Sequence, residues 1–114
     1  MAVTSNRQIT ITFGGDVEYA QTFTASTNAA GSGDNYLINL SSGNNTVSVP
    51  DNCVAVTIIP PVDNEEVITL KGINGDTGIA LALEDPCSLS LASSVTSFVL
   101  NASDAIEGVR IIFS

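Results

Sequence analysis

The stretch QITITF, residues 8–13, alternates polar and apolar positions without a break, as expected of a β-strand with one face toward a core. The turn-forming triplet GGD at 14–16 ends the alternation. Residues 18–24 resume it, so the beginning of the chain predicts a β-hairpin. The small residues of 25–34, which include two glycines, predict a flexible loop after the hairpin.

The same two-residue period, with frequent β-branched residues, recurs along the rest of the chain, and no window of eleven or more residues has a convincing 3.6-residue period. Further strands are predicted at residues 36–40, 46–49, 53–59, 67–71, 79–83, 88–91, 95–101 and 108–113. Roughly eight to ten short strands separated by turn signals are typical of an all-β fold. We therefore predict an antiparallel β-sandwich or a small, jelly-roll-like β-barrel.

The length of 114 residues and a hydrophobic content of 44% fit one compact domain, residues 1–114, with residues 1–6 as a flexible N-terminal arm. We find no internal repeat. The start of the chain has no apolar run typical of a signal peptide, and the longest mostly apolar stretch, 54–62, is too short to cross a bilayer. We therefore expect a soluble protein with no membrane partner.

The charge of the chain is strongly acidic. Three Lys or Arg stand against twelve Asp or Glu, a net charge of -9, so nucleic acids and anionic membranes are not expected as partners. The chain also has no His, and so lacks the usual proton shuttle at neutral pH and the commonest metal ligand.

One tripeptide, Asp76-Thr77-Gly78, matches the active-site triplet of aspartic proteases. That mechanism needs two aspartates sharing a proton on a cleft floor, usually after a buried apolar strand. Asn74 and Gly75 stand where apolar residues would be expected, and a turn capped by Asp explains the same residues.

No other pattern indicates chemistry. The acidic runs at 63–66 and 84–85 lack the alternating spacing of a calcium loop, and no nucleophile stands beside a base in a known motif. We therefore expect a protein that is not an enzyme and has no catalytic residue, metal or cofactor. Cys53 and Cys87 can form a disulfide or stay as thiols, and a reducing compartment favours thiols.

Two predicted strands, 53–59 and 108–113, are apolar on both faces. A small two-layer sandwich normally leaves the outer face of each sheet wet, so something should cover these strands. The cover is either a loop of the same chain or another protein molecule. As candidate interface residues on this second face we name Ile59, Pro60, Pro61 and Ile112.

Four segments of the second half, residues 53–114, together resemble small β-rich proteins of tailed bacteriophages: CVAVTIIPP at 53–61, ITLKGINGDTGI at 68–79, TSFVL at 96–100 and EGVRIIF at 107–113. Such proteins are often capsid decoration or cement proteins. The resemblance implies a structural virion protein that forms a homotrimer and binds the major capsid protein on the capsid exterior. It also implies assembly in the host cytoplasm and no cofactor. Its fold would be a β-sandwich.

Other proteins of this kind belong to tails or fibres, which leaves a second hypothesis open. A carbohydrate-binding or adhesion module on a phage tail or fibre would use loop residues around 28–36, where Tyr36 could stack on a sugar ring. Packing of that ring across strands is the alternative explanation.

Overall fold

The computed structural model describes residues 2–13, 19–30, 35–51 and 53–113. The chain divides into two compact units, residues 1–32 with residue 114, and residues 33–113, and each is described here by itself. The sequence predicts one domain over residues 1–114, and that remains a prediction.

The first unit contains two strands, β1 (Ala2–Phe13) and β2 (Tyr19–Ala30), which pair antiparallel from Phe13 opposite Tyr19 to Ala2 opposite Ala30. The predicted hairpin is thus confirmed, while its GGD triplet lies outside the described residues. Residues 25–30, part of the predicted loop, instead form a strand and pair with residues 2–7. Residues 2–6, which were predicted to belong to a flexible arm, are therefore also strand. Small residues do not prevent pairing, because the ladder satisfies backbone groups whatever the side chain.

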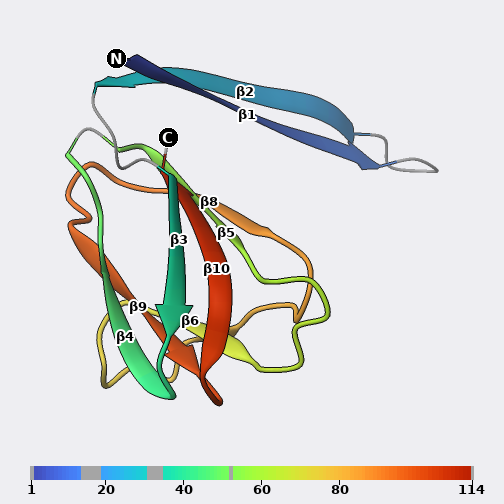
Figure 1. Cartoon of the computed structure of the whole chain (residues 1–114). Helices are drawn as coiled ribbons and strands as arrows, with labels where there is room; N and C mark the ends of the chain where they lie inside the picture. Colours follow the sequence, from blue (N-terminus) through green and yellow to red (C-terminus); the bar gives the residue numbers. More distant parts are fainter. Residues whose placement is uncertain (1, 14–18, 31–34, 52, 114) are drawn as a thin grey trace. The chain divides into compact units, whose positions relative to one another are not determined.

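The second unit is an all-β sandwich of two four-stranded antiparallel sheets, and no helix occurs among the described residues (Figure 1). This confirms the predicted fold class. Its strands are β3 (Asn35–Leu40), β4 (Gly43–Ser48), β5 (Ala55–Ile59), β6 (Ile68–Lys71), β7 (Ile79–Ala80), β8 (Cys87–Ser90), β9 (Ser97–Ala102) and β10 (Ile106–Phe113).

The order of strands in the sheets defines a jelly roll. One sheet has the order β3-β10-β5-β8 and the other β4-β9-β6-β7. The antiparallel pairs β3–β10, β4–β9, β5–β8 and β6–β7 are nested in the sequence like the rungs of one long hairpin, with its tip between β6 and β7. Rolling that hairpin up produces the two packed sheets of the jelly roll.

The core lies between the sheets and is built from alternate residues of the central strands. Leu100 of β9 and Val109 of β10 are completely buried, and Ile58 and Ile111 are 1% exposed. In β10 the alternation is interrupted once, between Ile106 and Val109, where the register with β3 shifts.

Gly108 produces that shift. Its φ of 82° lies in the left-handed region that L side chains avoid, and its N–H donates to Oδ1 of Asn39 at 3.1 Å. The resulting bulge lets both Ile106 and Val109 be buried. In a regular strand, residues three positions apart would lie on opposite faces.

Truncation of Leu100, one of the two completely buried side chains, tests this description of the core. Leu100→Ala should lower the free energy of unfolding by about 2–5 kcal/mol, because it removes buried contacts and leaves a cavity. Urea denaturation measures the change. Val62→Ala, at a side chain that is 91% exposed, is the control and should change stability by less than about 0.5 kcal/mol. Equal midpoints for the two variants would contradict the assignment.

Candidate functional site

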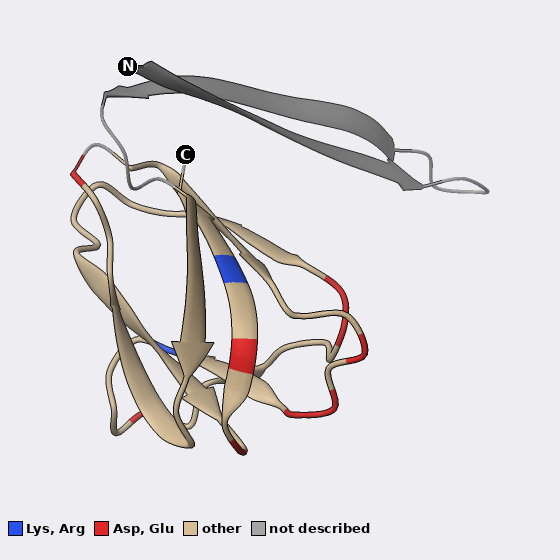
Figure 2. Cartoon of the chain, in the orientation of Figure 1, with Lys and Arg blue, Asp and Glu red and all other residues tan. Residues whose placement is uncertain are grey.

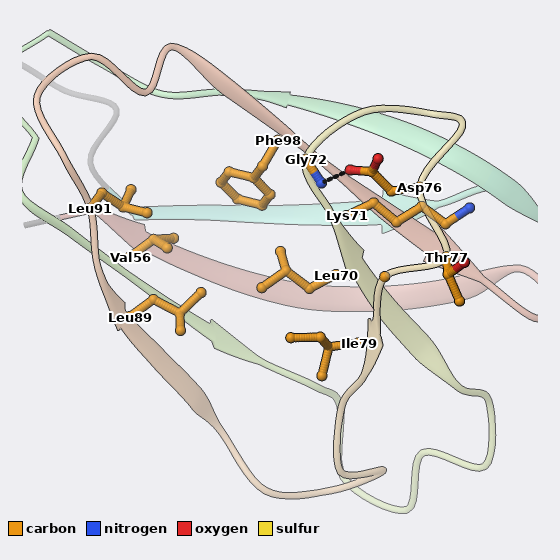
Figure 3. Close-up of a pocket in the computed structure, with 11 residues that line it drawn as sticks. Val56, Leu70, Lys71, Gly72, Asp76, Thr77, Ile79, Leu89, Leu91 and Phe98 are labelled. Atoms are coloured by element: carbon orange, nitrogen blue, oxygen red, sulfur yellow. Dashed lines mark hydrogen bonds between the residues drawn. The ribbon is translucent and has the colours of Figure 1, made fainter.

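An apolar cleft lies between the two sheets of the sandwich, at the side where β7 and β8 form their edges (Figure 3). Its volume is about 590 Å³. We call it the β7–β8 cleft, and it is lined by Val56, Leu70, Lys71, Gly72, Asp76, Thr77, Gly78, Ile79, Leu89, Leu91 and Phe98.

The cleft is open because both edge strands are short. β7 has two residues and β8 has four. One further backbone hydrogen bond, from Leu81 N–H to the carbonyl of Ile68 at 2.8 Å, follows β7 before the chain leaves the sheet. Ile79, on the wall of the cleft, is consequently 68% exposed, a large exposure for an isoleucine that faces the gap between two sheets.

One wall of the cleft is the turn that joins β6 to β7. Oδ2 of Asp76 accepts a hydrogen bond from the N–H of Gly72 at 3.0 Å (Figure 3). The same oxygen accepts from the N–H of Ile73 at 3.0 Å, and the Asp76 N–H donates to the carbonyl of Ile73 at 3.2 Å. Gly78 then has a φ of 76°. This is the geometry of the capped turn, the alternative to the protease triplet, because the Asp76 carboxylate holds backbone groups of its own loop.

Among the described residues that line the cleft, Lys71 is the only cationic one, and it lies at the rim. Lys71 follows Leu70 in β6, so its side chain belongs to the opposite face of the sheet. Its Nζ donates to Oδ1 of Asn44 at 3.3 Å, and the same oxygen accepts from Nδ2 of Asn101 at 2.8 Å. The ammonium is held on the outer face of the sheet, which leaves an aliphatic and aromatic interior.

Acidic residues of the sandwich lie mainly in its loops and turns (Figure 2). The two acidic runs are connected by Asn64, which is 8% exposed and donates from Nδ2 to the carbonyls of Glu66 at 2.8 Å and Leu83 at 2.7 Å. The contacts of Asn64 therefore give it a structural role, for which the sequence contains no signal.

In the described part of the chain, no three His, Cys, Asp or Glu residues are grouped so as to hold a metal ion.

The four candidate interface residues lie at one end of β5 and on β10. Ile59 and Ile112 are half-buried and occupy the same outer face, because Ile59 pairs with Arg110 and Ile112 with Thr57. Pro60 is buried and Pro61 half-buried. Sequence reasoning missed Leu37, which is 63% exposed and pairs with Arg110 on the same face. Whether another molecule covers this face stays a prediction.

Tyr36, the residue proposed for sugar stacking, contacts the ring of Phe113 edge-on, with centroids 5.9 Å apart at 79°. Tyr36 as a whole is 41% exposed and lines a smaller hollow of about 280 Å³ near β3 and β4. Residues 28–30 of the predicted binding loop belong to β2, and 31–34 lie outside the described residues. The geometry of Tyr36 fits the packing alternative, and the glycan site stays a prediction.

Both cysteines are free thiols. Cys53 is buried, and its Sγ donates to the carbonyl of Ala55 at 3.0 Å. Cys87, on the edge strand β8, is half-buried, and desolvation raises the pKa of its thiol.

The chain matches no protein family model, no curated protein and no solved structure. The part of the chain that the structure describes contains no helix that is long and apolar enough to cross a membrane. The arrangement of the cleft therefore has to be interpreted from its own physical chemistry.

The side chains that line the cleft were not predicted as a site. Val56, Leu89 and Phe98 come from three strands that are far apart in the sequence, and the sequence predicted only that each belongs to a strand. The only local signal was an isoleucine, Ile79, directly after a glycine-rich turn.

The cleft wall can be tested at two glycines of the same turn. A Cβ on Gly78 would lie 2.6 Å from the carbonyl oxygen of Leu70, at a φ that is itself strained, whereas a Cβ on Gly75 would meet nothing within 4 Å. Gly78→Ala should therefore lower the free energy of unfolding by about 2 kcal/mol or more. Gly75→Ala should stay within about 0.5 kcal/mol of the native protein. Equal effects in urea denaturation would mean that the turn is not packed as described.

The thiols give a pH-dependent test. Because burial raises the pKa of Cys87, less thiolate is present at any given pH than in the unfolded chain. Iodoacetamide should then alkylate Cys87 more slowly in the folded protein than in urea, with the rate still rising above the pH at which the unfolded thiol levels off. Cys87→Ser is the control and should show no labelling of Cys53 until the protein unfolds. Rapid labelling of Cys53 in the folded protein would contradict its burial.

Proposed function

We propose that this protein is a structural virion component, a capsid decoration or cement protein of a tailed bacteriophage that binds shell subunits and stabilises the head. The observation that carries the proposal is the β7–β8 cleft. It is an apolar hollow at an open sheet edge, suited to receive a protruding aliphatic side chain or strand of a neighbouring subunit. The resemblance of residues 53–114 to phage virion proteins supports the same conclusion.

The site supports binding more than chemistry. The interior of the cleft is formed by side chains such as Val56, Leu70 and Phe98, and the carboxylate at its rim, Asp76, is engaged by backbone N–H groups. Burying one aliphatic side chain there contributes about 1.5–3 kcal/mol. Such a contact is weak singly and becomes strong when many copies bind one symmetric shell.

The acidic surface is compatible with this role. The chain has a net charge of -9, and acidic loops of this kind keep copies apart in solution until specific apolar contacts form. We further propose that the major capsid protein is the partner and that the protein acts as a homo-oligomer, a trimer in the simplest case, on the outside of the capsid.

Rebinding to stripped particles tests the cleft. The chain should co-purify with virions, and particles stripped of it should release their DNA at a lower temperature. Ile79→Asp places a charge on the cleft wall, so its affinity for stripped particles should fall by at least about tenfold, the equivalent of one lost aliphatic contact.

The matched control is Val62→Asp, which makes the same chemical change at a side chain that is 91% exposed and does not line the cleft. It should bind like the native protein. A chain that is absent from virions, or particles that resist heat equally well without it, would refute the function. Equal loss of binding in both variants would refute the cleft as the docking site.

A further inference from the structure

The β1–β2 hairpin is a sheet that lacks neighbours. Its two twelve-residue strands form a two-stranded sheet, so within the described residues each strand keeps one edge without a ladder partner. A two-stranded sheet is marginally stable in water unless something packs on it, and an open edge is a template for another chain. The hairpin therefore needs a contact beyond its own two strands.

At one end of the hairpin, the pairing register places mostly apolar residues on one face and mostly polar residues on the other. Residues opposite each other in the ladder share a face, and every second residue shares it too. One face carries, in pairs, Ile9 with Phe23, Ile11 with Gln21 and Phe13 with Tyr19. The opposite face carries, over the same length, Gln8 with Thr24, Thr10 with Thr22 and Thr12 with Ala20. We call the five residues Ile9, Ile11, Phe13, Tyr19 and Phe23 the apolar half-face.

The hairpin also carries little net charge. Residues 2–30 include Arg7, Asp16 and Glu18, a net charge of -1, whereas residues 35–113 include nine acidic and two basic ones, a net charge of -7. Copies of a chain with a net charge of -9 repel each other at distances within the Debye length, about 8 Å at physiological salt. The segment at which copies can meet with least repulsion is therefore the hairpin.

Length favours another hairpin as the occupant of this surface. Twelve residues of antiparallel strand extend about 40 Å, while β10, the longest strand of the sandwich, has eight residues and extends about 27 Å. A second copy of the hairpin offers a surface of equal length and the same apolar pattern, as symmetric association requires.

We propose that the β1–β2 hairpin is the self-association element of the protein, in which the apolar half-faces of hairpins from neighbouring copies pack against one another. The purpose of this self-association rests on the proposed function, to which it adds a second contact. The hairpins hold copies together, and the β7–β8 cleft of each sandwich binds the shell. The partner at the hairpin is a second copy of this chain.

The first test is the mass of the full chain in solution. Light scattering coupled to size exclusion, over a wide range of concentration, should find an oligomer for the native protein. Ile9→Thr with Ile11→Thr keeps β-branched residues in the strand but removes aliphatic surface, so it should raise the dissociation constant at least about tenfold. The control, Gln8→Thr with Thr10→Ser, changes the polar face and should leave the mass unchanged.

A crosslinking measurement covers the case in which the double variant simply fails to form its hairpin. In a Cys87→Ser background, Ile11→Cys should give disulfide-linked dimers under mild oxidation, while Thr10→Cys on the opposite face should not. Dimers from Thr10→Cys alone, or equally from both, would overturn the proposal. So would a native protein that is monomeric at every concentration, or a double variant with the native mass. Neither experiment uses virions, so their failure leaves the capsid proposal to its own rebinding test.

Discussion

The sandwich is organised by β9 and β10, which follow each other in the chain and occupy central positions in opposite sheets. Each sheet has to bury one face, and the facing residues of these two strands, such as Leu100 and Val109, are completely withdrawn from water. The other strands are positioned by pairing outward from them, with β4 and β6 beside β9 and with β3 and β5 beside β10. The nested jelly-roll order follows from extending this pairing along one long rolled hairpin.

The open edge is a consequence of the same arrangement. β7 and β8 are the edge strands of the two sheets on one side, and both are too short to cover the inner-face residues beside them. Leu70, Leu89 and Phe98 therefore line a hollow instead of a closed core. A protein that fills the centre of its sandwich and leaves one apolar edge uncovered has a surface suited to a partner.

Charge is distributed so that the two proposed contact surfaces stay nearly apolar. The acidic residues of the sandwich are mostly in loops, Lys71 is held on the outer face by Asn44, and the strands of the hairpin include Arg7 as their single charge. Charged loops favour solubility, and apolar contact surfaces avoid the desolvation cost of charged groups. Assembly by burial is consistent with both features.

The all-β class, the hairpin at residues 8–24 and the approximate position of most strands could be predicted from the sequence, because a two-residue period and turn residues are local signals. It also offered the turn at Asp76 as an alternative, since Asp and Gly are frequent in such turns. It failed at residues 25–30, whose small residues resemble a loop but pair with residues 2–7 of β1.

Three features required the folded structure: which strands are neighbours, where the cleft opens, and the shared face of Leu37, Ile59 and Ile112. Pairing between distant strands depends on the whole set of hydrogen-bond partners and on how well the two sheets pack. The residues that flank a position in the sequence do not determine this long-range pairing. The bulge at Gly108 and the short β7 could therefore be recognised only in the folded chain.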